Sequence, residues 1–205
     1  MLLHIRPDNI DDRHINQVVN TLRNGGIIIY PTDTVYTLGC DINNTKAYER
    51  ICKLKGVKPN KANFSIVCFD LSHLSDFTTQ IPNPCYKLMK RALPGPFTFI
   101  LNANQKVSKI FGYNKKTVGI RVPDNNICRA IVDALGSPIL SASIKNDDTI
   151  LEYITDPDAL YEAYENVVDL VIDGGPSDNI ASTIINYTST EPFLVREGKG
   201  DINAI

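Results

Sequence analysis

Short runs of β-branched and aromatic residues alternate with segments of helical periodicity along most of this chain, and this alternation restricts the fold more than any other feature. Between residues 11 and 24 the apolar residues recur at helical spacing, and Gly25 provides a left-handed stop. The run Ile27–Ile29 follows and ends at Tyr30-Pro31, where proline cannot donate to a sheet. A helix followed by a buried strand is therefore predicted at the start of the chain.

The same alternation of helical and strand segments continues to the end of the chain and predicts an α/β fold. The last three predicted strands have no helices between them, so we expect a mixed sheet, twisted and flanked by helices, rather than a purely parallel one. The further helices are expected at 46–55, 86–92 and 127–135 and after Thr155-Asp156-Pro157, and the further strands at 64–69, 97–101, 117–122, 138–143, 170–173, 182–185 and 193–196.

The chain is predicted to form one domain over residues 1–205. Its 205 residues, 43% of them hydrophobic, are enough to bury one sizeable core. The polar loops are short, and no repeat, low-complexity tract or long Gly/Ser linker marks an internal boundary.

Composition argues against several broad classes of protein, among them zinc-binding, secreted and membrane proteins. The five cysteines show no zinc-ligand spacing and are expected to be reduced core residues. The N-terminal segment has no signal-peptide pattern and no apolar run could span a bilayer, so we expect a cytoplasmic protein without a membrane partner. The net charge of −2 provides no global positive field for nucleic acid.

Motifs for common catalytic and metal sites are also missing. His4, His14 and His73 are far apart and lack a neighbouring ligand or nucleophile pattern, so no metal site and no histidine-based triad is expected, and all three are predicted to lie on the surface. Gly174-Gly175 matches neither a P-loop nor a dinucleotide fingerprint and is predicted to be a turn.

Small hydroxyl and cationic residues at strand ends are the best candidates for a ligand site, because ligands of open α/β sheets bind in crevices at strand ends. Arg121 is the strongest, since it lies inside an apolar strand where a guanidinium needs an anionic partner. Each of the others also has an ordinary structural explanation, such as a cap, a turn or an ion pair. The candidates are Thr32, Thr34, Lys55, Arg121, Ser141, Ser143, Ser182 and Arg196.

The motifs GGIIIYPTDTVYTLGCDINN, KLKG, LPGPFTFIL, VGIRVP, LSASI and ASTIIN with VREGKGD resemble, in this order, the YrdC-like family over roughly residues 15–201. The resemblance implies a twisted α/β sheet with a concave, positively lined cavity. The best-known members are threonylcarbamoyl-adenylate synthases, which combine threonine, bicarbonate and ATP for a tRNA modification. An enzyme of this kind, or a weakened relative, is the leading hypothesis.

The resemblance also implies roles for the candidates. Thr32, Arg121 and Ser182 would hold the amino acid. Lys55, Ser141, Ser143 and Arg196 would hold the phosphates and ribose of ATP. Lys55 and Arg196 would be the catalytic residues, supplying charge with Mg²⁺ alongside, because attack on an α-phosphate needs alignment and charge stabilisation more than a protein nucleophile.

The chain departs from the family pattern at two nucleotide positions. Synthases usually have Lys-x-Arg and Ser-x-Asn, whereas this chain has Val57 and Lys145 in place of the Arg and the Asn. Lys58 would compensate for Val57 through a one-residue shift. Together with Asn63-Phe64, these departures make the chain resemble the YciO branch of the family, and they predict slow adenylate formation.

Two alternatives stay open. Basic clusters at 53–61, 87–91 and 106–116 would allow shape-and-phosphate recognition of double-stranded RNA or tRNA, a property described for members of this family. A metabolite sensor that keeps the cavity without catalysis is the second. The sequence does not fix the oligomeric state.

Overall fold

The computed structural model describes residues 1–111, 113–144, 154–189 and 191–205. These residues form a single α/β domain with a ten-stranded mixed sheet, in agreement with the prediction. The helices are α1 (Asp12–Arg23), α2 (Thr45–Leu54), α3 (Asn83–Ala92), α4 (Gln105–Phe111), α5 (Asn126–Leu135) and α6 (Pro157–Tyr164), with the 3₁₀ turns η1 (Pro59–Lys61), η2 (Leu74–Asp76) and η3 (Ile202–Ala204).

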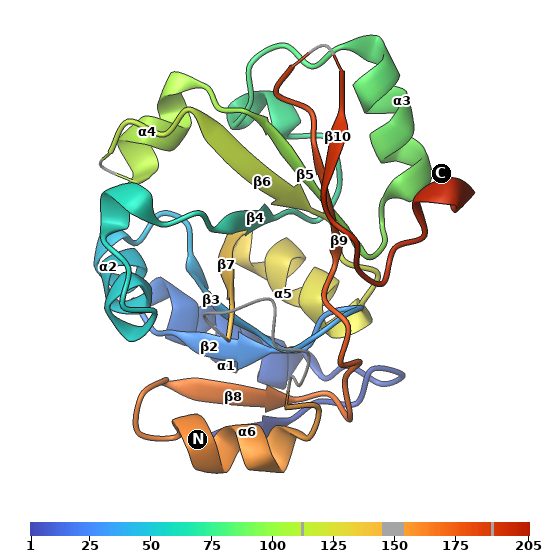
Figure 1. The fold of residues 1–205 in the computed structure, drawn as a ribbon. Helices are drawn as coiled ribbons and strands as arrows, with labels where there is room; N and C mark the ends of the chain where they lie inside the picture. Colours follow the sequence, from blue (N-terminus) through green and yellow to red (C-terminus); the bar gives the residue numbers. More distant parts are fainter. Residues whose placement is uncertain (112, 145–153, 190) are drawn as a thin grey trace.

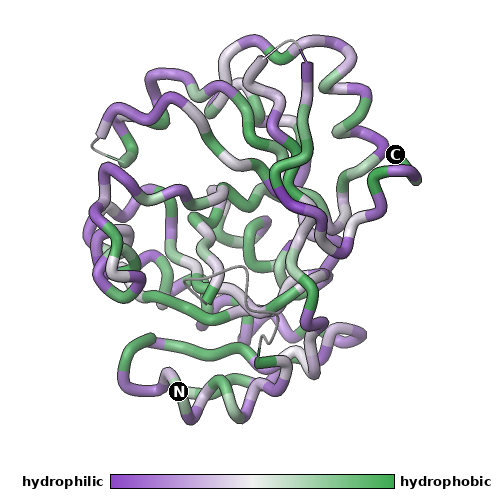
Figure 2. The backbone as a smooth tube through the Cα atoms, viewed as in Figure 1, coloured by the Kyte–Doolittle hydropathy of each residue, from purple (hydrophilic) through white to green (hydrophobic). Residues whose placement is uncertain are grey.

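The strands run in the order β1-β8-β2-β3-β7-β4-β6-β5-β9-β10, with parallel and antiparallel neighbours (Figure 1). The central strands are mainly hydrophobic, whereas hydrophilic residues dominate the outer loops (Figure 2). The strands are β1 (Leu2–His4), β2 (Ile28–Tyr30), β3 (Thr37–Asp41), β4 (Ser65–Val67), β5 (Phe97–Asn102), β6 (Thr117–Arg121), β7 (Ile139–Ser143), β8 (Leu170–Asp173), β9 (Thr183–Asn186) and β10 (Phe193–Arg196).

The predicted helix boundaries follow from local chemistry. The side chains of Asp11 and Asn125 cap the starts of α1 and α5 by accepting backbone N–H bonds. Gly25 and Gly136, which follow these helices, have φ of 81° and 71° and provide the left-handed stops expected from the sequence. The strands β1 and β3 and the helix α4 were not predicted.

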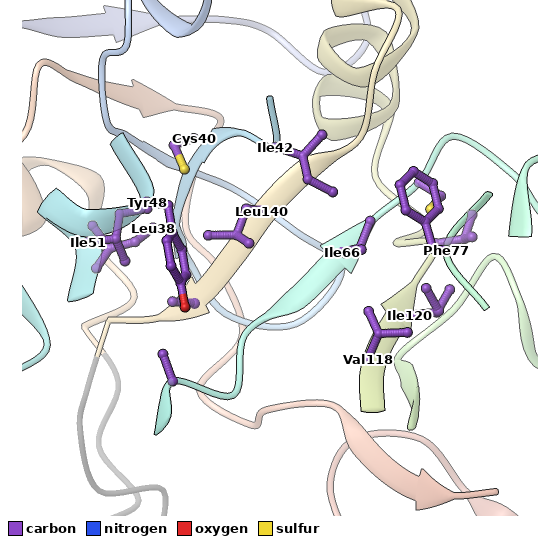
Figure 3. Packing of buried hydrophobic residues seen from close by; sticks show 14 of the residues in the cluster. Leu38, Cys40, Ile42, Tyr48, Ile51, Ile66, Phe77, Val118, Ile120 and Leu140 are labelled. Atoms are coloured by element: carbon purple, nitrogen blue, oxygen red, sulfur yellow. The ribbon is translucent and has the colours of Figure 1, made fainter. Parts of the chain in front are cut away.

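One core cluster lies against α2, α4 and one sheet face, where Leu38, Leu140, Ile66 and Ile120 come from four adjacent strands (Figure 3). The other cluster packs α1 and α5 against the opposite face. All five cysteines are free and buried, as expected. Within the described residues, no helix is long and apolar enough to cross a membrane.

The face covered by α1 and α5 changes character along its own strands. Ile139 of β7 and Val67 of β4 are paired neighbours in the apolar cluster beneath α5. Two residues along each strand, on the same face, the next paired neighbours are Ser141 and Ser65. The sheet face therefore continues beyond the helices as a polar surface, and this surface is where the candidate residues gather.

Candidate functional site

A cavity of about 340 Å³ lies over the polar part of this sheet face, and we call it the polar cavity. It is lined by four cationic side chains, those of Lys55, Lys61, Arg121 and Arg196, and no carboxylate is among its described lining residues. The sequence-predicted candidates that line it are Thr34, Lys55, Arg121, Ser141, Ser143, Ser182 and Arg196.

Thr32 is the predicted site residue that is not in this lining. Its hydroxyl donates to the carbonyl oxygen of Val35 at 2.8 Å and lies 3.0 Å from the Thr34 hydroxyl. Thr32 therefore braces the loop between β2 and β3 from inside, and Thr34 is the threonine that this loop presents to the cavity.

Arg121 ends β6 at the edge of the cavity. Its Nη2 donates to Asp33 Oδ1 at 3.0 Å and to the Thr34 hydroxyl at 3.1 Å. The Arg121 and Asp33 side chains are only 7% and 8% exposed, yet Arg121 Nε and Asp33 Oδ2 have no hydrogen-bond partner among the described residues. Buried polar atoms of this kind are rare unless a ligand or water completes them. The predicted anionic partner is present, but it uses only part of the guanidinium.

Lys55 follows α2 and is buried at 8% exposure. Its Nζ donates to the carbonyl oxygens of Ser143 at 2.6 Å and Ile144 at 3.3 Å, at the end of β7. These contacts fix the ammonium at the rim of the cavity, beside the Ser143 side chain that also lines it.

Two groups of hydrogen-bonded hydroxyl side chains lie at the sheet surface beneath the polar cavity, which we call its floor. Tyr30 Oη donates to Ser141 Oγ at 3.0 Å, and the Thr37 hydroxyl lies 3.2 Å from the same oxygen. Burial raises the pKa of Tyr30, so its phenol stays protonated as a donor. On the other side, Thr98 Oγ1 lies 2.8 Å from Ser182 Oγ.

Arg196 reaches the cavity from β10. Its Nη2 and Nε donate to the carbonyl oxygen of Ser182 at 2.9 and 3.2 Å. The pairing of β10 with β9 shifts between Leu194 and Arg196, which is the signature of a β-bulge. The extra residue, Val195, lines a neighbouring cavity.

That second cavity has a volume of about 380 Å³ and shares six lining residues with the polar cavity, namely Ala62, Asn63, Phe64, Ser65, Thr98 and Ile184. Its other walls include aromatic and aliphatic side chains. Its one described cation, Lys115, donates its ammonium to the carbonyl oxygens of Asn60 and Ala62. The two joined cavities therefore differ sharply in charge.

Several lining residues were missed in the sequence. Thr98 had a usable signal, because it alternates along β5 with Phe97 and Phe99 and must face away from them. Lys61 had none, since a short 3₁₀ turn places it. Lys199, also missed, donates to the carbonyl oxygen of Asp33 at 2.6 Å and pairs with Asp178 at 3.1 Å, and so ties the C-terminal segment to the loop that carries Thr34.

Two sequence hypotheses have different outcomes. Lys58, the suggested substitute for the missing arginine, is not among the described lining residues of either cavity. Lys145, which replaces the expected asparagine, lies outside the described residues.

The sequence of this chain is similar to those of known proteins. The profile of the Sua5_yciO_yrdC family, described as "Telomere recombination", matches residues 20–198. The chain is 41% identical over 200 residues to the uncharacterized protein YciO of Escherichia coli K12, covering 97% of this chain and 96% of YciO. It is 30% identical to the threonylcarbamoyl-AMP synthase of Bacillus subtilis, covering 92% of this chain but 54% of the synthase.

Solved structures agree with these matches. The crystal structure of E. coli YciO superposes with a TM-score of 0.89 at 40% identity, covering 100% of this chain and 98% of YciO. The structure of Pyrococcus abyssi Sua5 complexed with L-threonine gives a TM-score of 0.86 at 26% identity, covering 97% of this chain and 57% of Sua5.

Proposed function

Because this chain belongs to the Sua5–YciO–YrdC family, we propose that its polar cavity binds ATP beside an amino acid and forms a threonylcarbamoyl-adenylate or a related acyl-adenylate. The observation that carries the proposal is the charge of the cavity. A protein with a net charge of −2 gathers four cations in one cavity whose described lining has no carboxylate, an arrangement that favours a polyanionic ligand.

Each lining residue of the polar cavity is assigned either to the amino acid or to the nucleotide. Arg121, Thr34 and Ser182 line the cavity and are assigned to the amino acid, because a guanidinium suits a carboxylate. Lys55, Ser141 and Ser143 also line it and are assigned to the phosphates and ribose. The base is assigned to the second cavity, whose aromatic and aliphatic walls suit a flat, uncharged ring.

The reaction needs no protein nucleophile. Threonine and bicarbonate combine to a carbamate with loss of water, and a carbamate oxygen attacks the α-phosphate of ATP. The bond between the α-phosphorus and the bridging oxygen breaks, and pyrophosphate leaves. Lys55 and Arg196 stabilise the negative charge at the phosphates during this step.

The residues that the structure describes do not form a magnesium site of their own. The described lining of the polar cavity has no carboxylate, and no group of three or more His, Cys, Asp or Glu in the described residues could hold a metal ion. Magnesium is therefore expected to enter on the phosphates of ATP, and no protein ligand is assigned to it.

The test is isothermal titration of ATP and threonine, separately and together, followed by a pyrophosphate-release assay with bicarbonate. We expect Lys55→Ala to weaken ATP binding by roughly 1.5–3 kcal/mol, the worth of a charge-assisted phosphate contact. Lys53→Ala, which removes a cation of α2 that does not line the cavity, is the matched control. If the parent binds no ATP, or if both variants bind it like the parent, the proposed function is wrong.

The two alternatives predict other outcomes. A metabolite sensor would bind ATP or threonine and release no pyrophosphate. An RNA-binding protein would bind double-stranded RNA or tRNA with an affinity that falls steeply with salt and hardly varies with sequence. Against a continuous RNA surface, Lys115 is bound to backbone carbonyls, and the exposed Lys106 is paired with the carboxylate of Asp76. Two cations of one basic cluster therefore already have partners within the protein.

A further inference from the structure

Val57 lines the polar cavity at a position where the family pattern has a cation. Its side chain lines the cavity in the place where synthases usually carry an arginine. An aliphatic group cannot bind a phosphate, so either the cavity works with one charge fewer or another residue supplies it. The neighbouring segment, residues 58–64, contains the candidates.

Lys61 lines the same cavity wall as Val57, four positions later in the chain. It is the last residue of η1, and the 3₁₀ turn brings it to the cavity, whereas Lys58 before the turn does not line it. Two lysines three residues apart in one short segment therefore differ in the one property that matters for ligand binding.

The backbone on both sides of Lys61 is fixed by hydrogen bonds from the side chains of Tyr48 and Lys115. Tyr48 Oη donates to the carbonyl oxygen of Pro59 at 2.5 Å, and Lys115 Nζ donates to those of Asn60, at 3.2 Å, and Ala62. Burial lowers the pKa of Lys115, whose ammonium is engaged in these bonds. The segment thus presents Lys61 from a braced turn.

The ammonium of Lys61 makes no hydrogen bond or ion pair with any described residue. Lys61 is exposed, so its ammonium is available to a ligand that enters the cavity. An anionic ligand there would be attracted by Lys61 together with the three other cations of the lining.

We propose that Lys61 replaces the missing arginine and binds a phosphate of the nucleotide, so that the phosphate contact has moved from position 57 to the η1 turn. This inference rests on the proposed function. The phosphate contact made by Lys61 would also differ chemically from one made by an arginine. An ammonium is a point charge on a flexible stem, whereas a guanidinium is a planar fork.

The experiment compares ATP with adenosine, which lacks the phosphates, by titration at physiological salt. We expect Lys61→Ala to weaken ATP binding about tenfold or more and to leave adenosine binding unchanged. Lys58→Ala is the matched control and should change neither by more than about twofold. Thermal unfolding of each variant verifies that it is folded.

A charge-relocation variant makes the test sharper. Val57→Arg in the Lys61→Ala background returns a cation to the same cavity wall, so ATP affinity should recover substantially, whereas Val57→Arg alone should add little to the parent. Equal ATP affinity for Lys61→Ala and Lys58→Ala, or no recovery in the double variant, would overturn the inference. If ATP binding depends on Lys55 but not on Lys61, the inference fails while the proposed function survives; if the parent binds no ATP, both fail.

Discussion

Two parts of one sheet face behave in opposite ways, although the same strands build both. Beneath α5, Ile139 and Val67 are fully buried in an apolar cluster. Two residues further along the same strands, Ser141 and Ser65 face the polar cavity. Residues two apart on a strand share a face, so a change from apolar to polar side chains along that face converts a core surface into the polar lining of a cavity, without a change of backbone.

Polar side chains on the face of a sheet inside a folded domain need a different kind of stabilisation from apolar ones. In the apolar part, burial itself stabilises the contacts. In the polar part, each hydroxyl needs a partner, and the Tyr30–Ser141–Thr37 and Thr98–Ser182 contacts provide them. These contacts satisfy the hydroxyls of the floor, whereas Arg121 Nε and Asp33 Oδ2 are buried without a partner in the described part of the chain.

The largest effect is expected at that pair. Arg121→Met leaves the Asp33 carboxylate buried without its cation and should reduce the free energy of unfolding by about 3–5 kcal/mol. Asp33→Asn added to Arg121→Met should recover part of this loss, because neither position of the pair then carries a buried charge. Urea unfolding of the single and double variants measures both, and a double variant no more stable than Arg121→Met would contradict the role of the ion pair.

Arg121→Lys separates ligand binding from stability at the same position. It keeps the charge opposite Asp33 but loses the planar fork, so threonine affinity should fall more than ATP affinity. Titration of both ligands decides, and an equal loss of the two would show that Arg121 is structural.

A somewhat smaller effect should distinguish the two parts of the face. Ile139→Ala removes buried methyl groups beneath α5 and should cost about 2–5 kcal/mol of unfolding free energy. Ser65→Ala, on the polar side, should change it by less than ~0.5 kcal/mol. Comparable losses in urea unfolding would mean that the polar part carries as much packing as the apolar part.

The smallest effect concerns the second cavity. Val195 is 49% exposed on β10 and lines this cavity, while the adjacent Leu194 is 42% exposed and lines neither cavity. Val195→Trp should fill the space proposed for the base and weaken ATP binding roughly tenfold, or ~1.4 kcal/mol. Binding of tripolyphosphate, which has no base, should stay the same, and Leu194→Trp should affect neither ligand.

Comparison of the two Trp variants by titration determines whether the base lies there. An equal loss of ATP and tripolyphosphate in Val195→Trp would mean that the tryptophan disturbs phosphate binding instead, and the base would have to be placed elsewhere.

The alternation of strands and helices, the mixed sheet and the family could be predicted from the sequence because their signals are local. The missed strands lacked such signals: β1 has the sequence Leu-Leu-His, without a β-branched residue, and β3 includes Thr37 and Gly39. In the site, Arg121 was identifiable by its apolar surroundings. Its pairing with Asp33, the inward position of Thr32 and the reach of Lys61 depend on how distant segments pack, which residue spacing does not encode.

The contact between Lys199 and the Asp33 carbonyl has a consequence for the order in which this molecule assembles. The two residues are 166 positions apart in the chain, so their loop is among the most expensive in entropy to close. The apolar cluster under α1 and α5 also closes long loops, as between Leu3 and Ile172, but burial of apolar surface drives those contacts, whereas the Lys199 contact is a polar one. We therefore expect the cluster to form first during refolding, and competence to bind ligand to return in the final kinetic phase. Stopped-flow refolding in the presence of a fluorescent ATP analogue would show this as a delay between burial of the core and recovery of binding.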